Sequence, residues 1–263
     1  MRLRDYLRRL GLSGPLTPDS DTLRRVHRAH RETFLFDNLA IQTGGRVSVA
    51  LGDLERKFLD EGRGGYCFEH NTLFAAALGD LGFGTTALLG RVRRGPPAQR
   101  GRTHMVLLVP VDRDVWLADV GFGAQSLIEP IPFKDAAAST QLGLAYTLRR
   151  EGRLWVLAAT DAAAAMDLYE FTDDPQTPAD VEIANHYTST HPASVFRRTL
   201  TIQRVTRDER ITLRNDTLIR QRGGRAVEAR VDRARLPEVV REAFGIELAH
   251  GPFVFEEPAI ATA

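Results

Sequence analysis

Hydrophobic residues recur at helical spacing through the first third of the chain. The stretch Thr17-Pro18-Asp19 supplies, in that order, a helix cap, a proline suited to the first helical position and an acid in the first turn, and the apolar positions that follow it keep the period of a helix. The same spacing predicts helices over residues 53–61 and 67–81 and a short amphipathic helix at the N-terminus. The sequence therefore predicts an N-terminal helical bundle.

The hydrophobic period shortens after residue 84. Short runs rich in valine, leucine and aromatic residues alternate with glycine, proline or aspartate turns, which is typical of antiparallel strands. We predict strands over residues 85–92, 104–111, 115–120, 146–150 and 154–158, loops over 96–102 and 134–140, and a short helix or lid over 159–168. We expect these strands to form a β-barrel.

The last third of the chain combines strands with one helix. Strands are predicted near residues 198–206, 210–214, 217–222 and 226–231, followed by a helix through residues 236–244 that ends at Gly245. Helices, then sheet, then sheet with a helix define an α+β protein. We expect three subdomains, covering residues 1–84, 85–190 and 191–263.

Composition narrows the possible partners. The chain has 263 residues, 43% of them hydrophobic, and a formal net charge of +1, so it has no strongly basic surface for nucleic acid or an anionic membrane. It has no apolar run long enough to span a membrane and no secretion signal at its start. With a single cysteine and therefore no internal disulfide, we expect a cytoplasmic protein. The sequence leaves its oligomeric state open.

The only cysteine, Cys67, lies in the stretch R-G-G-Y-C-F-E-H-N at residues 63–71. A lone cysteine is usually a small, inert core residue. Here, however, two glycines allow a sharp turn, and Cys67 falls in the first turn of a predicted helix. Unpaired N–H groups and the helix dipole favour a thiolate there, and the same N–H groups suit the oxyanion of an acyl-transfer intermediate. This context favours a nucleophile, which then needs a base and an orienting acid.

His104 and Asp119 are polar residues in two neighbouring apolar strands, and each needs a partner. If residues 112 and 113 alone form the turn between these strands, residue 111 pairs with 114 and residue 104 with 121. Asp119 is then the diagonal neighbour of His104 on the same face of the sheet. A slip of one residue would place them on opposite faces. We therefore predict that Cys67, His104 and Asp119 lie together as nucleophile, base and orienting acid.

The other histidines have simpler interpretations. His27 and His30, three residues apart on a helix, are interpreted as packing residues rather than as half of a metal site, and no metal site is expected. His70, one turn after the cysteine, is expected to support it rather than to act as its base. His186 and His191 flank a polar stretch and are expected to line or cap a cleft.

Three stretches together resemble the motifs of the arylamine N-acetyltransferase family: R-G-G-Y-C-F-E-H-N with Cys67, T-H-M-V-L-L-V with His104, and W-L-A-D-V-G-F-G with Asp119. Residues 5–12, 26–39 and 235–248 extend the likeness over nearly the whole chain. It implies a helical bundle, a β-barrel and an α/β lid around a cysteine-protease-like catalytic core. It also implies a Cys-His-Asp triad and ping-pong acetyl transfer to an arylamine, hydrazine or N-hydroxyarylamine, a chemistry of xenobiotic metabolism. The donor, acetyl-CoA, is a co-substrate, so no bound cofactor is expected.

The resemblance also implies binding residues. Thr103, Phe122 and Gly123 fall where the family contacts CoA or the acceptor, and Phe36 falls where it lines the acceptor pocket, although each also suits a core or turn position. One departure is visible, because Leu35-Phe36-Asp37-Asn38-Leu39 stands where the family commonly has Pro-Phe-Glu-Asn-Leu. This change bears on the choice of acceptor and leaves the triad untouched.

Three other functions remain open at this stage. Amide synthases that close a polyketide chain into a macrolactam resemble the same fold and triad but take their acyl group from a carrier protein, and the short tail beyond F-G-I-E-L at residues 244–248 keeps this alternative open. A peptidase or transglutaminase would use similar machinery on an amide, without releasing CoA from acetyl-CoA. A binding protein without turnover would have an unreactive Cys67.

Overall fold

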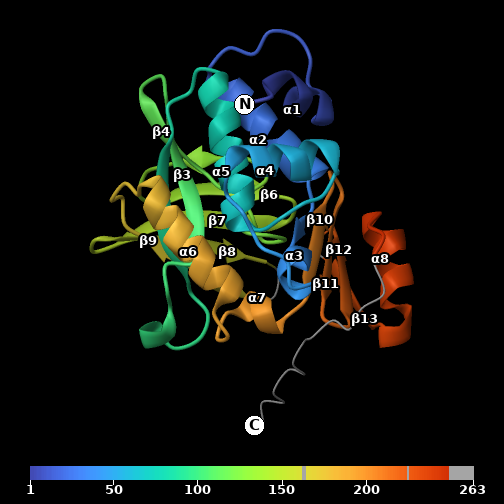
Figure 1. The fold of residues 1–263 in the computed structure, drawn as a ribbon. Coiled ribbons are helices and arrows are strands. Elements are labelled where there is room, and N and C mark those ends of the chain that lie inside the picture. The colour runs from blue at the N-terminus through green and yellow to red at the C-terminus, as the bar shows by residue number, and fades with distance from the viewer. Residues whose placement is uncertain (162–163, 224, 249–263) are drawn as a thin grey trace.

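The computed structural model describes residues 1–161, 164–223 and 225–248. Helices from the first third pack beside an eight-stranded sheet, and a five-stranded sheet covered by a helix completes the molecule (Figure 1). This is the predicted α+β arrangement. No helix in the described part of the chain is both long and apolar enough to cross a membrane.

The N-terminal helices form around one apolar core. Asp19 accepts a hydrogen bond from the Thr22 N–H at 2.8 Å and caps the second helix, so this helix begins two residues later than predicted, with Asp19 and not Thr17 as its cap. The predicted helix over residues 53–61 is observed as a short α-helix continued by a π-helical turn. The elements are α1 (Leu3–Arg9), α2 (Ser20–Thr33), α3 (Leu39–Gln42), α4 (Leu51–Glu55), the π-helical turn η1 (Arg56–Asp60) and α5 (Cys67–Asp80).

The eight-stranded sheet is antiparallel throughout and nearly closes into a barrel. Its strand order is β5-β4-β3-β2-β9-β8-β7-β6, so the two end strands follow one another in the chain. Apolar side chains fill its interior. The strands are β2 (Thr86–Val92), β3 (His104–Val111), β4 (Asp114–Ala118), β5 (Ile131–Pro132), β6 (Ala137–Gln141), β7 (Leu144–Glu151), β8 (Leu154–Thr160) and β9 (Ala165–Phe171), with a 3-10 turn η2 (Pro97–Gln99) between β2 and β3.

Two predictions for this region are wrong, and one helix was not predicted. Residues 134–140, expected to be a loop, include most of β6, whose small and polar side chains hid the strand signal. Where described, residues 159–168 are the end of β8 and the start of β9 rather than a helix or lid, and residues 162 and 163 lie outside the described residues. Helix α6 (Pro178–Thr190) was not predicted, because exposed Ile183 and Tyr187 obscure its apolar face.

The third part of the structure is a five-stranded antiparallel sheet. The four predicted strands and the final helix are confirmed, and Gly245 ends that helix in the left-handed conformation (φ 71°). The sheet gains an unpredicted edge strand, β1 (Phe36–Asp37), from the N-terminal part of the chain. Its other elements are α7 (Val195–Arg198), β10 (Thr201–Val205), β11 (Glu209–Arg214), β12 (Thr217–Arg222), β13 (Arg225–Arg230), the 3-10 turn η3 (Arg233–Arg235) and α8 (Leu236–Phe244).

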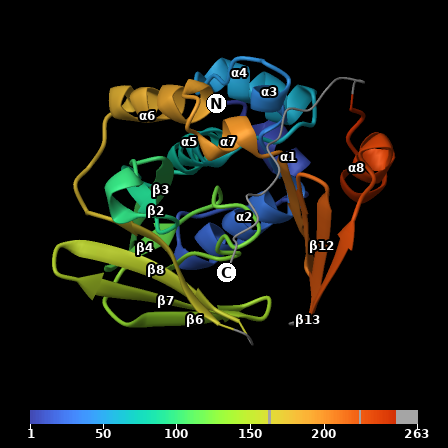
Figure 2. The same ribbon diagram turned by 90° about the horizontal axis from the view of Figure 1, so that it is seen from below.

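Figure 2 shows α8 on the outer face of this sheet and the barrel on the other side, with α2 between them. Helix α6 packs on the helical core through Val181 and Ala184. The three parts of the fold therefore meet around α2 and α5.

A chain of hydrogen bonds runs through the helical core. The Tyr6 hydroxyl lies 2.7 Å from His30 Nδ1, His30 Nε2 lies 2.9 Å from His70 Nδ1, and His70 Nε2 lies 3.0 Å from the Leu35 carbonyl oxygen. Because a carbonyl can only accept, His70 Nε2 donates to it, which makes His70 Nδ1 the acceptor for His30 and His30 Nδ1 the acceptor for Tyr6. With both rings neutral, each donor in this chain has one acceptor.

His27 is buried in the same core. Its Nδ1 donates to the Ile128 carbonyl at 2.9 Å, and its ring meets Phe74 edge-on at 5.5 Å. The interpretation of His27 and His30 as packing residues is confirmed. Burial lowers the pKa of His27 to about 4 and that of His70 to about 3, and it lowers the pKa of His30 well below its ordinary value.

We expect thermal stability to fall as pH decreases from about 7 to about 5. Below the ordinary histidine pKa of 6.5 the unfolded chain takes up protons, whereas the folded chain excludes them until pH nears the lowered values. The free energy of unfolding therefore decreases, by up to ~1.4 kcal/mol per pH unit for each buried histidine. Circular dichroism melts across this range measure the effect. A variant of an exposed histidine, His186→Asn, should show the same slope, and a pH-independent melting temperature would contradict the expectation.

Candidate active site

The loop before Cys67 packs backbone against backbone on the segment around β1. The Gly65 carbonyl accepts from the Asp37 N–H at 2.8 Å, and the Gly65 N–H donates to the Leu35 carbonyl at 3.3 Å. A Cβ on Gly64 would lie 1.9 Å from the Leu35 oxygen. Neither glycine has a positive φ. The double glycine is therefore required for close approach rather than for the sharp turn expected from the sequence.

The start of α5 is held by a partly buried ion pair. Glu69 Oε1 lies 2.6 Å from Lys57 Nζ, and Glu69 Oε2 accepts from the Tyr66 N–H at 3.1 Å. The π-helical turn η1 carries Lys57 to this position. The Tyr66 hydroxyl donates to the side chain of Asn185 on α6. Side chains from η1, α5 and α6 thus fix the turn in which Cys67 lies.

His104 and Asp119 meet as the hairpin register predicts. Val111 pairs with Asp114, so the turn contains two residues. His104 Nε2 lies 2.8 Å from Asp119 Oδ2, and both side chains are buried. Because the carboxylate accepts this bond, the neutral imidazole carries its proton on Nε2 and keeps the lone pair on Nδ1.

Asp119 is held by donors from two further directions. Its Oδ1 accepts from the Gly121 N–H at 2.8 Å and from Asn71 Nδ2 at 3.2 Å. Burial alone would raise the pKa of Asp119, but the charge and hydrogen bond of His104, together with these two donors, lower it below its ordinary value. The carboxylate is therefore ionised at neutral pH and available to stabilise an imidazolium.

Cys67 lies against the chain neighbours of His104 and Asp119. Its thiol donates to the carbonyl of Thr103, the neighbour of His104, at 3.6 Å. A Cβ on Gly121 would lie 2.7 Å from the Cα of Cys67, so the segment that follows Asp119 touches the start of α5. The structure thus brings the three predicted catalytic residues into one buried region.

Burial raises the pKa of the Cys67 thiol. The backbone N–H groups of Met105 and Phe68 oppose this effect, and the charge of Asp119 adds to it. The expectation that the helix N-terminus gives this cysteine a lowered pKa is therefore wrong, because burial outweighs the N–H groups of the first turn. A base beside the sulfur must take its proton for the sulfur to react.

The predicted binding residues lie on two sides of this region. The ring of Phe122 lies 4.9 Å from that of His104, and Phe36 is buried 6.1 Å from Phe196 on α7. Gly123 has a φ of +85°, and a Cβ there would lie 2.1 Å from Oε1 of Gln203 on β10. Thr103 is half-buried before His104, and its carbonyl accepts from the thiol, as described above.

Two buried arginines hold residues 120–126. Arg31 of α2 donates to the carbonyls of residues 120 and 123 at 3.2 and 2.6 Å, and Arg210 of β11 donates to those of residues 124 and 126. In the described part of the chain neither guanidinium forms an ion pair. The dipoles of carbonyl and hydroxyl groups therefore stabilise both positive charges. This segment, which includes Phe122 and Gly123, is thereby joined to the helical bundle and the third sheet.

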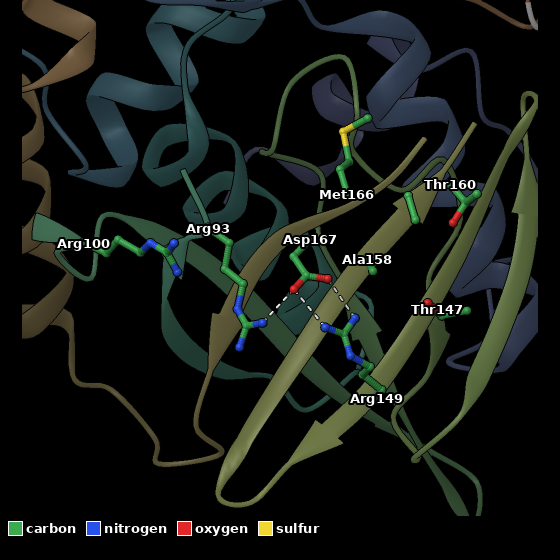
Figure 3. Close-up of a pocket in the computed structure, with 9 residues that line it drawn as sticks. Arg93, Arg100, Thr147, Arg149, Ala158, Thr160, Met166 and Asp167 are labelled. Carbon is green, nitrogen blue, oxygen red and sulfur yellow. Dashed lines mark hydrogen bonds and ion pairs between the residues drawn. The ribbon is translucent and has the colours of Figure 1, made fainter. Parts of the chain in front are cut away.

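A hollow of about 550 Å³ lies on the barrel strands (Figure 3). Arg93 and Arg149 form ion pairs with Asp167 at 2.6 and 2.8 Å on its wall. None of the predicted site residues lines it. Its lining residues are Arg93, Arg100, Thr147, Arg149, Ala158, Thr160, Ala165, Met166 and Asp167.

Sequence reasoning missed several residues of the site. Asn71 lies one turn after Cys67 and bonds Asp119, the Met105 carbonyl at 2.8 Å and the Val120 N–H at 3.2 Å. Its place in the cysteine motif, four residues from the sulfur on the same helix face, was the available signal. Tyr169, whose ring lies 4.7 Å from that of His104, falls in none of the predicted strands. Arg31 and Gln203 gave no local signal.

Comparison with known proteins identifies the class to which this fold and site belong. A family model of N-acetyltransferases matches residues 19–253. The arylamine N-acetyltransferase of Escherichia coli (strain K12) is 36% identical over 99% of this chain and 95% of its own length. The solved structure of Mycobacterium marinum arylamine N-acetyltransferase in complex with CoA matches with a TM-score of 0.88 at 31% identity, covering 93% of each chain.

The chain belongs to the arylamine N-acetyltransferase family and is an acyltransferase. The family resemblance and the predicted fold are confirmed. A more limited similarity links it to proansamycin X synthase of Amycolatopsis mediterranei (strain S699), with 30% identity over 66% of this chain and 69% of the relative.

We expect Gly121→Ala to separate residues 119–121 from the start of α5. The added Cβ would lie 2.7 Å from the Cys67 Cα and 2.6 Å from Asn71 Nδ2, and neither group has room to move. Overpacking of this kind costs ~1–3 kcal/mol, measurable by urea unfolding, and acetyl transfer should fall with it. Gly79→Ala on the same helix meets nothing within 4 Å and should be neutral or stabilising. Equal effects of the two substitutions would contradict this account.

Proposed function

We propose that the protein transfers an acetyl group from acetyl-CoA to the nitrogen of arylamines, hydrazines or N-hydroxyarylamines, and that Cys67 carries the acetyl group between the two substrates. His104 acts as the base and Asp119 orients it. The main support is the 2.8 Å bond from His104 Nε2 to a buried, ionised carboxylate beside a buried thiol. This bond assigns one imidazole nitrogen as the donor and leaves the other to accept the thiol proton.

In the first half-reaction the sulfur of Cys67 attacks the thioester carbonyl of acetyl-CoA, and its proton passes to His104 Nδ1. The Asp119 carboxylate stabilises the resulting imidazolium. The N–H groups of Phe68 and Met105, which favour negative charge at the sulfur, also favour the oxyanion that forms next to it. The bond to the CoA sulfur then breaks, CoA leaves with the proton from His104, and an acetyl-cysteine remains.

In the second half-reaction the amine attacks the acetyl-cysteine. It loses a proton to His104, which returns that proton to the departing sulfur as the amide is released. Aromatic rings on both sides of the region suit a flat acceptor, with Phe36 on the acceptor side and Phe122 beside His104. Thr103 and Gly123 contact CoA or the acceptor. A free thiol as nucleophile suits a reducing compartment, and we place the protein in the cytoplasm.

Intact mass spectrometry tests this proposal. Incubation with acetyl-CoA alone should add one acetyl group to the protein, and an arylamine or hydrazide should then remove it and appear as the amide. Because Cys67 is the only cysteine, Cys67→Ala removes every thiol and should neither gain the mass nor release CoA. If the protein stays unacylated with acetyl-CoA but is acylated by a carrier-protein thioester, the acetyltransferase proposal is wrong and the macrolactam-forming amide synthase replaces it.

Asp119→Asn should lower turnover by at least ~10²-fold while preserving the fold. The amide side chain can reverse the tautomer of His104 by offering it a donor, and it does not stabilise the imidazolium. Steady-state kinetics with an arylamine measure the effect, and circular dichroism checks the fold. A folded variant with near-normal turnover would show that Asp119 has no part in the reaction.

A further inference from the structure

His70 is buried one turn after Cys67 on α5 and has no part in the transfer chemistry proposed above. It contacts the acceptor side of the site at two points. Its Nε2 donates to the Leu35 carbonyl at 3.0 Å, and its ring lies nearly parallel to that of Phe36, with an interplanar angle of 11° and 6.2 Å between the ring centres. We call residues 35 and 36 the acceptor wall, because Phe36 is the residue proposed to line the pocket for the amine. A side chain on the same helix as Cys67 therefore fixes the backbone of this acceptor wall.

The Leu35 carbonyl is also the point where the nucleophile loop meets that wall. It accepts from the Gly65 N–H at 3.3 Å and from His70 at 3.0 Å, and Gly64 leaves no space beside it. One oxygen thus links the loop before Cys67, the helix after it and the strand that carries Phe36. The shorter of its two hydrogen bonds comes from the histidine.

The opposite side of the His70 ring is held just as firmly. Because Nε2 donates to the Leu35 carbonyl, Nδ1 of the neutral ring accepts from His30, which accepts in turn from Tyr6. Both ring nitrogens are occupied, which excludes His70 as the base for Cys67. The ring is edge-on to Phe58 at 5.1 Å, which further limits its movement.

We propose that His70 is a positioning residue for acetyl transfer: by donating to the Leu35 carbonyl, it sets the acceptor wall at Phe36 relative to Cys67. This inference rests on the proposed function and adds to it a determinant of geometry that takes no part in proton transfer. Small displacements of this kind are costly, since a misplacement of about 1 Å can reduce a rate by ~10²-fold.

Two substitutions separate the two bonds of the ring. The amide nitrogen of His70→Gln can occupy the position of Nε2 and donate to Leu35, but the variant loses the bond to His30. The amide oxygen of His70→Asn can occupy the position of Nδ1 and accept from His30, but the variant loses the bond to Leu35. Each variant forfeits one buried hydrogen bond, so their melting temperatures should fall by similar amounts.

We expect His70→Asn to lower kcat by ~10-fold or more, and His70→Gln to stay within ~3-fold of wild type, with KM for acetyl-CoA nearly unchanged in both. The rate at which iodoacetamide alkylates Cys67 should follow the same order, because it also depends on where the loop holds the sulfur. Exposed His186→Gln serves as the control. Equal losses in the two variants would show that His70 is merely structural and would overturn the proposal.

The alkylation rate of Cys67 distinguishes a failure of the positioning role of His70 from a failure of the proposed function. If wild-type protein transfers no acetyl group yet the two variants still differ in alkylation rate, the function proposal fails and the positioning role stands. If wild type transfers acetyl normally and the variants behave alike, only the positioning role fails. Should His70→Asn not fold, His70→Gln alone decides, because a folded glutamine variant with a loss of ~10-fold or more would overturn the proposal.

Discussion

The backbone of the Cys67 loop and helix is held between two contacts that only glycine permits, and the site depends on this steric constraint. On one side Gly64 lies directly against the Leu35 carbonyl, and on the other Gly121 lies directly against the Cα of Cys67. No side chain separates these backbones, so the start of α5 approaches the segment before β1 on one side and the segment after Asp119 on the other as closely as main chains can. The position of the sulfur is thus set by packing and not by any bond that the sulfur itself makes.

Polar groups buried by this close approach are satisfied by partners from several elements. Asp119 receives donors from β3, from α5 and from its own segment, while its N–H donates to Nε2 of His27 on α2 at 3.2 Å. Such a network specifies one arrangement, because any displacement leaves a buried donor or acceptor without a partner. The same dependence explains why the helical core, the barrel and the segment around Phe122 cannot shift independently of one another.

The sequence predicts those features of the site that follow from local periodicity and from turn length. A two-residue turn after Val111 was enough to place Asp119 beside His104, because strand register fixes which side chains share a face. The double glycine pointed to Cys67, although for close approach rather than for a turn. The buried position of Cys67 could not be predicted, and so neither could the direction of its pKa shift, because burial depends on segments that are distant in sequence.

The residues that were missed share one property. Asn71, Arg31 and Gln203 act through main-chain groups of segments far away in sequence, and no spacing rule relates a side chain to such a partner.

Strand β6 and helix α6 were missed for a different reason. Their apolar faces are weak, so tertiary packing rather than local pattern decides their conformation.

The pairing of β1 with β10 also has a consequence for the order in which the protein can be completed. The Asn38 side chain accepts from the Thr201 N–H across 163 residues, and Phe36 pairs with Gln203 on the same edge. During synthesis Cys67, His104 and Asp119 all leave the ribosome before the strand that anchors Phe36 exists. A nascent chain that ends after the barrel would contain Cys67, His104 and Asp119 but not the strand that pairs with Phe36, so this arrangement is completed only after residues 201–205 are made.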